Sequence, residues 1–370
     1  MRILHLIHSE GVYGAELILL YLAREQQQRG HQVTLGSMRD PGTPQTPFEA
    51  LAASYGVNVV PLRIAPRPTP RVRGALLSCA RDLQAQLLHS HGYKANILLG
   101  LVPGGARPPA VATLHGWTTS RGLSRLRLYE WLDARALGRL EAAVVVARSM
   151  LELPALRALP PAKRHLIENG IPPRATRLAD LAAQGVPAPP AALLDFMQRA
   201  PTLLAIGRLS AEKNFAQLIE AFARARPQGG GTHQLLIIGE GAQREALARQ
   251  IEAAGLAPAV KLGGYLAGAD RLLAQAAGFV MSSLTEGLPL VLLEALQWQV
   301  PILATSVGAI PDLLRGGAGQ LLPAGDLDAL TGGLARLMQA PAAAAAGEPD
   351  ARYSSARMAR EYLDLYERIT

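Results

Sequence analysis

The stretch RILHLIHSEGVYGAELILLYLAREQQQRGHQVTL, residues 2–35, decides the fold class. It predicts a strand over residues 2–7, a polar turn, a helix that opens at Gly14 and ends at Gly30, and a second strand over residues 31–35. Strands that alternate with helices indicate a parallel sheet that helices cover on both faces. The alternation continues with strands predicted at residues 110–114, 142–146 and 163–168.

The second half of the chain repeats this pattern. Prolines are dense between residues 171 and 201, and we interpret residues 176–200 as an interdomain linker. The fold expected is therefore α/β, with two doubly wound Rossmann-like domains at residues 1–175 and 201–350. A last helix, within residues 352–370, is expected to pack back on the first domain. Strands are predicted in the second domain at residues 202–206, 234–238, 260–262, 278–281 and 301–305, and helices at residues 216–225, 243–254, 270–276 and 289–296.

The composition excludes several classes of protein. Of the 370 residues, 49% are hydrophobic, which supports a large core and excludes disorder of the whole chain. Cys79 is the only cysteine, so the chain has neither a disulfide framework nor a cysteine-ligated zinc site, and it suits a reducing compartment. The apolar opening is too short for a signal peptide, and no stretch is apolar enough to span a bilayer. We expect a cytoplasmic protein.

Positive charge is concentrated in the first 200 residues, which hold 23 Lys and Arg against 13 Asp and Glu, whereas the rest holds 14 against 16. Two basic stretches in this half have apolar residues between the charges, which suits an anionic membrane surface or a phosphorylated acceptor. The alternative is an arginine-rich composition with solvated loops and helices. The arginines that we place on this membrane or acceptor surface are Arg67, Arg71, Arg73, Arg125 and Arg127.

The segment SSLTEGLPLVLLE, residues 282–294, follows a predicted buried strand and opens a helix. A helix start at the carboxyl end of a parallel strand presents free N–H groups that suit phosphate oxygens. On a helix, the spacing of Glu286 and Glu294 puts them about 12 Å apart on nearly the same side. Two carboxylates so placed could hold hydroxyls at the two ends of a nucleotide sugar. A pair of unrelated surface glutamates is disfavoured, because Leu290 to Leu293 make the helix apolar almost all round.

Two cations follow the first strand of the second domain, in the segment AIGRLSAEKN at residues 205–214. Arg208 leaves the strand end and Lys213 follows on the next turn. Cations at that edge of a parallel sheet suit a departing diphosphate, whose charge builds in the transition state. Taken alone they would be ordinary loop cations, but with the glutamate motif the functional interpretation is favoured.

Together these motifs resemble a retaining glycosyltransferase of family 4 with the GT-B fold, of the kind that acts in cell-surface polysaccharide or glycolipid assembly. The resemblance implies two Rossmann-like domains that face each other across a cleft, with the acceptor bound by the first and the nucleotide-sugar donor by the second. The matching segments span nearly the whole chain and are GRL at residues 207–209 with Lys213, IGEG at 238–241, EGLP at 286–289 with Glu294, LATSVG at 303–308 and ENGI at 168–171.

The resemblance also implies roles for single residues. Arg208 and Lys213 resemble the pair that binds the donor diphosphate, and Glu294 resembles the acid that holds the ribose hydroxyls. Glu286 resembles the residue that contacts the donor sugar, beside the backbone of Gly287 and Leu290.

In the first domain, residues 11–16 resemble the family's glycine loop, in which the backbone of Gly14 and Ala15 would face the donor phosphates. This loop departs from the usual pair of adjacent glycines, because Tyr13 replaces the first. His115, at a predicted strand end, resembles the family's histidine near the reacting sugar, although a lone histidine there is more often structural. The catalytic residues expected are thus His115, Glu286, Arg208 and Lys213.

No metal or other cofactor is expected. Asp326-Leu327-Asp328 matches the metal-binding motif of a different glycosyltransferase fold, but Asp326 directly precedes a predicted helix, where aspartate is the expected cap. Arg208 and Lys213 would supply the positive charge instead. The chain also lacks the glycine-rich lysine loop of nucleotide hydrolases.

The function expected is transfer of a sugar, with retention of configuration, from a nucleoside diphosphate donor to a hydroxyl of a glycan or lipid-linked acceptor. A UDP-sugar is the favoured donor, and no nucleic-acid partner is expected. The enzyme would work in the cytoplasm, at the cytoplasmic face of the membrane if the acceptor is a lipid. Two alternatives stay open, a sugar-nucleotide epimerase of similar fold and a non-catalytic partner subunit.

Overall fold

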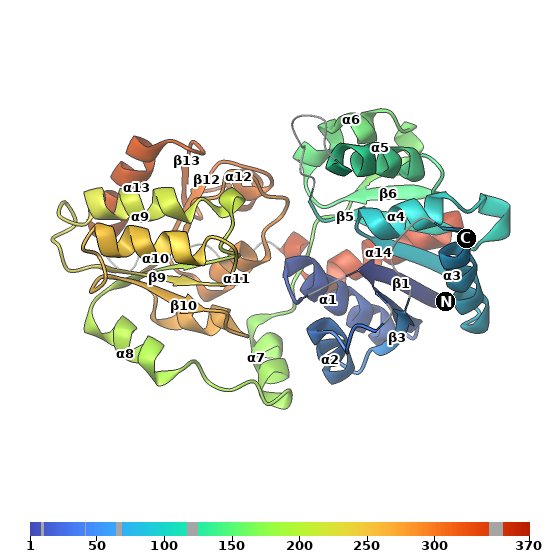
Figure 1. The fold of residues 1–370 in the computed structure, drawn as a ribbon, viewed down its shortest axis with the longest axis horizontal. Coiled ribbons are helices and arrows are strands. Elements are labelled where there is room, and N and C mark those ends of the chain that lie inside the picture. The colour runs from blue at the N-terminus through green and yellow to red at the C-terminus, as the bar shows by residue number, and fades with distance from the viewer. Residues whose placement is uncertain (9–10, 41, 64–68, 117–124, 340–350) are drawn as a thin grey trace. The chain divides into compact units, whose positions relative to one another are not determined.

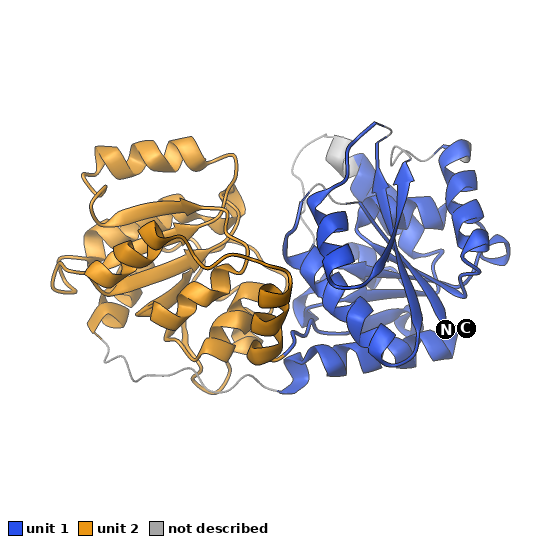
Figure 2. Cartoon of the chain, turned by 90° about the horizontal axis from the view of Figure 1, so that it is seen from below, with its two compact units in different colours: residues 1–172, 351–370 blue, residues 173–350 orange. Residues whose placement is uncertain are grey.

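The computed structural model describes residues 1–8, 11–40, 42–63, 69–116, 125–339 and 351–370. The chain divides into two compact units, coloured separately in Figure 2. Unit 1 consists of Met1–Pro172 and Ala351–Thr370, and unit 2 of Pro173–Asp350. Each unit contains one parallel sheet with helices around it (Figure 1).

Unit 1 has, within its described residues, a seven-stranded sheet in the order β3-β2-β1-β4-β5-β6-β7. All of its strand pairs are parallel. Because the strand order reverses beside β1, the carboxyl ends of β1 and β4 mark the switch point where ligands of such folds bind. The strands are β1 (Arg2–His8), β2 (Gln32–Arg39), β3 (Asn58–Arg63), β4 (Leu87–His91), β5 (Ala110–Leu114), β6 (Ala142–Val145) and β7 (Arg164–Leu166).

Helices connect these strands. Thr46 and Thr69 cap two of them, since each hydroxyl oxygen accepts a hydrogen bond from a backbone N–H in the first turn and a proline follows each cap. The helices are α1 (Gly14–Gln28), α2 (Pro47–Ser54), α3 (Pro70–Asp82), α4 (Tyr93–Gly100), α5 (Arg125–Leu137) and α6 (Pro154–Arg157), with short 3-10 turns η1 (Gly104–Ala106), η2 (Arg148–Glu152) and η3 (Pro161–Lys163).

The C-terminal segment belongs to unit 1. It consists of the 3-10 turn η6 (Ala351–Tyr353) and helix α14 (Ser355–Ile369), which Ser354 caps. Helix α14 packs against α1, and its Tyr362 and Tyr366 are buried. A backbone bridge between Ile171 and Ser354 ties this segment to the end of unit 1.

Unit 2 repeats the same topology, with the order β10-β9-β8-β11-β12-β13 in a six-stranded sheet of its described residues. Its switch point lies between β8 and β11. The strands are β8 (Thr202–Ile206), β9 (Gln234–Ile238), β10 (Val260–Gly264), β11 (Gly278–Met281), β12 (Ile302–Thr305) and β13 (Gln320–Leu322). The helices are α7 (Arg174–Ala183), α8 (Ala191–Arg199), α9 (Phe215–Ala225), α10 (Arg244–Ala253), α11 (Leu290–Trp298), α12 (Ile310–Leu313) and α13 (Leu327–Gln339), with 3-10 turns η4 (Ala211–Lys213) and η5 (Ala269–Gln275).

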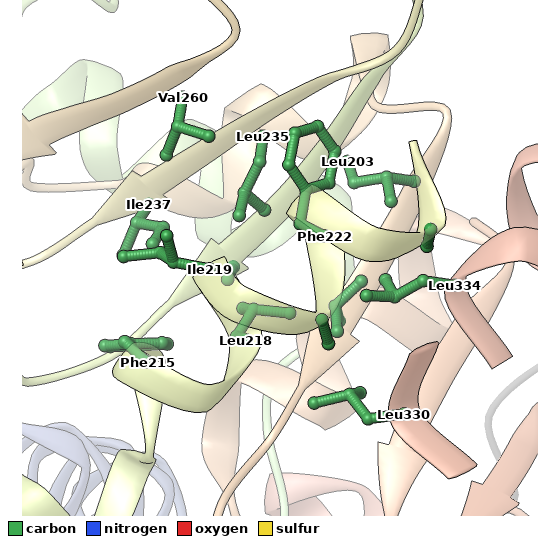
Figure 3. Packing of buried hydrophobic residues seen from close by; sticks show 14 of the residues in the cluster. Leu203, Phe215, Leu218, Ile219, Phe222, Leu235, Ile237, Val260, Leu330 and Leu334 are labelled. Atoms are coloured by element: carbon green, nitrogen blue, oxygen red, sulfur yellow. The ribbon is translucent and has the colours of Figure 1, made fainter. Parts of the chain in front are cut away.

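The core of unit 2 follows from its sequence periodicities. Alternate residues of β8 and β9 point to one face of the sheet, where Leu203, Leu235 and Ile237 are fully buried. Helix α9 lays its apolar side on this face with residues at helical spacing, among them Phe215 and Phe222, and α13 packs beside α9 (Figure 3). Strand β8 ends at Ile206, at the edge of this packed face, and the loop with Arg208 follows it.

The expected linker at residues 176–200 is wrong. These residues form most of α7 and all of α8, and both helices belong to unit 2. The prolines that suggested a linker precede the helices, because Pro173 and Pro190 are the N-cap residues of α7 and α8. Proline is compatible with a helix start, where its missing N–H leaves no hydrogen bond unmade.

In the part of the chain that the structure describes, no helix is both long enough and apolar enough to cross a membrane.

Candidate active site

The centre of the unit 2 site is an ion pair between Lys213 and Glu286. Lys213 closes the 3-10 turn after β8, and Glu286 lies in the loop after β11, so both follow the carboxyl ends of neighbouring strands. Lys213 Nζ donates to Glu286 Oε1 at 2.5 Å, and the Ser283 hydroxyl donates to the same oxygen at 2.6 Å. The lysine side chain is 18% exposed, so its charge is available to a ligand but partly shielded from water.

The loop that carries Glu286 is held by its backbone. Gly308 has φ +58°, and a Cβ there would lie 2.2 Å from the carbonyl oxygen of Glu286, so the close approach requires glycine. The backbone N–H of Ala309 donates to the carbonyl oxygen of Gly287 at 2.9 Å, and the Thr305 hydroxyl donates to that of Ser283 at 2.6 Å. The LATSVG segment therefore positions the glutamate loop.

Helix α11 begins directly after this loop. Its first residue is Leu290, and its N-cap is Pro289, which has no side-chain capping hydrogen bond. The N–H groups of a first helical turn have no intrahelical partner and favour an anion. Leu290 is thus the first residue of this helix, and Gly287 precedes it in the loop that carries Glu286.

The expected helical spacing between Glu286 and Glu294 is wrong, because Glu286 precedes the helix rather than lying on it. The helix begins four residues after Glu286, once the chain has passed Gly287 and the N-cap Pro289. The two acids are therefore held by different elements and by different partners.

Arg208 is the exposed cation of the site. Its side chain is 54% exposed, and its Nη2 lies 3.7 Å from Glu212. The backbone of this loop is packed against the glycines that follow β9, since a Cβ at Gly239 would lie 1.9 Å from the carbonyl oxygen of Gly207. The glycines of the IGEG segment thus allow the loop with Arg208 to pass close to the end of β9.

Glu294 lies in a buried cluster that the sequence analysis did not predict. Arg177 on α7 donates through Nη1 to Asp270 Oδ2 at 2.5 Å and to Glu294 Oε1 at 3.3 Å, so one guanidinium serves two acids. Burial, together with the negative charge of Asp270, raises the pKa of Glu294 to about 8, and the positive charge of Arg177 opposes this shift. Glu294 therefore carries a proton over much of the neutral pH range.

A signal for Arg177 was present but was assigned to the linker. Residues 174–183 form an amphipathic helix after Pro173, with Arg177 and Asp180 on its buried side. An arginine on the buried side of a helix needs an acidic partner. The identity of that partner, 117 residues away in sequence, follows only from the fold.

The residues expected in the first domain gather in unit 1. A pocket of about 250 Å³ is lined by Ala15 and Glu16 at the start of α1, by His115 after β5 and by His91 at the end of β4. Gly14 is the first residue of α1, and Glu16 accepts a hydrogen bond from the backbone N–H of Tyr13 at 3.0 Å. His115 Nε2 lies 2.9 Å from His91 Nδ1, and burial lowers the pKa of His115 to about 4. His115 is therefore neutral at physiological pH.

The same pocket contains Asp133, which the sequence analysis did not single out. Burial raises the pKa of its carboxyl group to about 6, while the hydrogen bond from Asn96 Nδ2 at 3.0 Å opposes the shift. The Ser90 hydroxyl in turn donates to Asn96 Oδ1 at 2.6 Å. The wall of the pocket is thus a polar network that holds one buried acid near its titration range.

The expected basic surface stays a prediction. Arg71 and Arg73 are exposed on α3, whereas Arg67 lies outside the described residues, as do the side chains of Arg125 and Arg127. Asp326, by contrast, has the role expected of it, because its Oδ1 accepts the N–H of Ala329 in the first turn of α13 at 2.9 Å. This supports the helix-cap interpretation of the Asp-Leu-Asp segment.

Comparison with known proteins agrees with both halves of this description. The family described as Glycosyltransferase Family 4 matches residues 12–175, and the family described as Glycosyl transferases group 1 matches residues 200–340. The two matched ranges together cover most of the chain and include His115 of the unit 1 pocket and Lys213, Glu286 and Glu294 of unit 2. The chain belongs to the family 4 glycosyltransferases with the GT-B fold, and its activity is glycosyl transfer.

Individual relatives are distant. The chain is 25% identical over 343 residues to the α-maltose-1-phosphate synthase of Mycolicibacterium smegmatis. The match covers 82% of this chain and 87% of the relative. It is 33% identical over 159 residues to the amylovoran biosynthesis glycosyltransferase AmsK of Erwinia amylovora, a match that covers 40% of this chain and 39% of AmsK. The structure of Anabaena HepE in complex with UDP-glucose has the same fold, with a TM-score of 0.76 and 19% identity over the full length of both chains.

Proposed function

We propose that this glycosyltransferase moves a sugar from a UDP-sugar to a hydroxyl of a glycan or lipid-linked acceptor, with retention of configuration and without a metal ion. The observation that carries the proposal is the Lys213–Glu286 pair beside the start of α11, at the carboxyl edge of a parallel sheet. The complex of the structurally similar HepE with UDP-glucose supports the choice of donor.

The donor diphosphate would lie between the cations and the helix start. Arg208, with its exposed guanidinium, and Lys213 would neutralise the charge that develops on the leaving diphosphate. The backbone N–H groups at the start of α11 would receive phosphate oxygens. With three sources of positive potential in one loop cluster, the chain needs no divalent cation for this step.

Glu286 would hold the donor sugar. Its Oε1 already accepts from Lys213 and Ser283, which fixes the carboxylate and leaves Oε2 for a sugar hydroxyl. Glu294, on the next helix, would bind the ribose hydroxyls. Because burial favours its protonated form, the group can both accept from one hydroxyl and donate to the other.

Unit 1 would bind the acceptor. His115 is neutral, so its role is to orient a hydroxyl rather than to supply charge. The acceptor hydroxyl would attack the sugar from the same face from which the leaving group departs, so that the configuration is retained. The proton of the acceptor hydroxyl would pass to the leaving diphosphate. Exclusion of water around the donor would limit its hydrolysis.

The experiment that tests the proposal is a screen of UDP-, GDP- and ADP-sugars for binding and then for slow release of the nucleoside diphosphate. We expect release from UDP-sugars, and NMR of the released sugar should show the anomer of the donor as the first product. Release of the opposite anomer would contradict retention. Conversion of the donor to its epimer without release would contradict transfer altogether.

A further inference from the structure

Unit 1 contains a line of imidazoles, of which the proposed function uses only His115. His5 on β1 and His91 on β4 come from neighbouring parallel strands, and His115 follows the next strand, β5. His5 is fully buried and His91 nearly so. At the inner end of the line, Gln26 on α1 is also fully buried.

Hydrogen bonds join these four side chains in one chain. Gln26 Oε1 lies 2.9 Å from His5 Nε2, His5 Nδ1 lies 3.0 Å from His91 Nε2, and His91 Nδ1 lies 2.9 Å from His115 Nε2. The three imidazoles are neutral, because burial lowers the pKa of His5 and of His115 to about 4 and that of His91 well below its usual value. A neutral imidazole has one N–H donor and one acceptor nitrogen.

The amide at the inner end gives the chain a direction. Gln26 Nε2 donates to the Tyr366 hydroxyl at 3.4 Å, which turns Oε1 toward His5. An amide oxygen only accepts, so the proton of His5 is on Nε2 and its Nδ1 accepts from His91. By the same rule His91 carries its proton on Nε2 and accepts through Nδ1 from His115. His115 therefore has its proton on Nε2 and a lone pair on Nδ1.

That lone pair is at the pocket end of the chain. His115 lines the 250 Å³ pocket, and among the residues that the structure describes its buried Nδ1 has no hydrogen-bond partner. A buried acceptor without a partner costs about 1–3 kcal/mol, a cost that a ligand hydroxyl would remove.

We propose that Gln26, His5 and His91 form a tautomer lock, which holds His115 with Nδ1 as a hydrogen-bond acceptor for a hydroxyl group of the ligand in the unit 1 pocket. Gln26, His5 and His91 are positioning residues, since they act through His115. An amide cannot take up a proton, so the chain ends in a fixed group and is not a path for protons to leave the site. That the hydroxyl belongs to a sugar rests on the proposed function, whereas the tautomer itself does not.

The adjoining His89 is arranged for structure rather than for metal binding. His5, His89 and His91 lie close enough to share an ion. However, His89 Nδ1 is 2.6 Å from the Tyr366 hydroxyl and its Nε2 is 2.7 Å from Thr113 Oγ1. Both ring nitrogens of His5 and of His91 are likewise engaged, in the hydrogen bonds from Gln26 to His115. Each ring nitrogen would have to give up a hydrogen bond to bind an ion.

The test is NMR of the whole protein with 15N-labelled histidine, because the ring nitrogen shifts distinguish the two tautomers directly. The chain has eight histidines, and the His115 signals are assigned by their loss in His115→Asn. We expect His115 to be protonated on Nε2 and not on Nδ1 in the wild type. If His115 of the wild type carried its proton on Nδ1, or were an imidazolium at neutral pH, the proposal would be overturned by this spectrum alone.

The second arm removes the group that sets the direction. In Gln26→Leu the two directions of the chain become nearly equivalent, so a fraction of His115 should carry its proton on Nδ1, although residue 26 does not touch His115. Tyr362→Phe is the matched control, because this buried hydroxyl lies 2.9 Å from Thr113 Oγ1 on the His89 branch. The control should leave the His115 tautomer unchanged.

Two outcomes of this arm would overturn the lock, namely an unchanged His115 tautomer in Gln26→Leu or the same change in Tyr362→Phe. The link to function is read separately as kcat/KM for sugar-nucleotide turnover, which should fall about five- to tenfold in Gln26→Leu, equivalent to loss of one oriented hydrogen bond. A changed tautomer with unchanged kcat/KM would keep the lock but refute its role at the sugar. If the wild-type protein showed no glycosyl transfer, the proposed function would be refuted, but the result on the tautomer would still hold.

Discussion

Glu294→Gln should stabilise unit 2 at alkaline pH. The native carboxyl group is buried beside Asp270, and its pKa is raised from 4.5 to about 8. Between these two values the native state binds a proton that the unfolded state has lost, so the stability of the wild type falls as pH rises. Glutamine has the shape of the protonated acid and can still accept from Arg177, and it removes this titration.

The magnitude follows from the size of the shift. One unit of pKa corresponds to about 1.4 kcal/mol, so the free energy of unfolding of the variant relative to the wild type should rise by about 1.4 kcal/mol per pH unit between pH 5 and pH 8. The full difference is on the order of 3–5 kcal/mol above pH 8, and it should vanish near pH 4.5. A discount for solvent is not required, because the Glu294 side chain is only 14% exposed.

The assay is urea unfolding of both proteins at pH 5, 6, 7, 8 and 9, followed for the transition of unit 2. Glu245→Gln is the control, since this glutamate lies on α10 of the same unit and is 90% exposed. Its free energy of unfolding should follow that of the wild type within a few tenths of a kcal/mol at every pH. A flat difference between Glu294→Gln and the wild type would show that Glu294 is ionised in the native state, and would refute the reasoning.

Two further substitutions test the unit 2 site. Lys213→Ala should lower the turnover of the sugar nucleotide by roughly two orders of magnitude, because it removes the ammonium group beside the leaving diphosphate. The control is Lys261→Ala, at a lysine of β10 whose Nζ donates to the carbonyl oxygen of Ala192, and it should leave turnover unchanged. Equal rates in the two variants would contradict the role of Lys213. Gly308→Ala should weaken nucleotide binding about tenfold in a calorimetric titration, since the new Cβ displaces the Glu286 loop. A non-glycine residue at this positive φ also strains the backbone by about 1–3 kcal/mol. Gly255→Ala has a similar positive φ in open space and should bind as the wild type does, so equal affinities in the two glycine variants would argue against a positioning role for Gly308.

The raised pKa of Glu294 suggests why a glutamate stands there. Strongly shifted pKa values are frequent at functional sites, and the proposed function gives Glu294 the ribose hydroxyls as partners. Arg177 offsets part of the cost by reaching both Asp270 and Glu294. The cluster thus connects the stability of unit 2 with its proposed donor site.

The sequence predicted most of the strands and several of the helices, because their periodicity is strong. The last helix is predicted within residues 352–370 and observed as Ser355–Ile369, and the helix predicted at residues 216–225 is observed as Phe215–Ala225. Both have a narrow apolar side that packs on a sheet or on a neighbouring helix.

Two of the strands that the sequence analysis missed have weak local signals. Strand β3 lies at one edge of its sheet and contains Pro61, a residue that usually argues against a strand. Strand β13 has only three residues and lies at the edge of the other sheet. In both strands the pairing with a neighbour decides the structure, and this pairing is not visible in the segment itself.

The site was predicted where its residues lie in one short segment and missed where partners are distant in sequence. The motifs placed Arg208, Lys213 and Glu286 after strand ends, and the structure places them there. The partner of Lys213 did not follow from the motif, because Glu286 lies 73 residues further along the chain. The histidine chain is similar, since it joins segments 86 and 24 residues apart and its direction depends on Gln26 in α1.

We propose that the Lys213–Glu286 pair and Glu294 together bind a nucleoside diphosphate. The most direct measurement is a calorimetric titration of UDP into the wild type, Glu294→Ala and Glu245→Ala. We expect saturable binding to the wild type, at least tenfold weaker binding to Glu294→Ala, and wild-type affinity in Glu245→Ala. Affinities that are the same in all three proteins, or no binding to the wild type, would contradict the site described for unit 2.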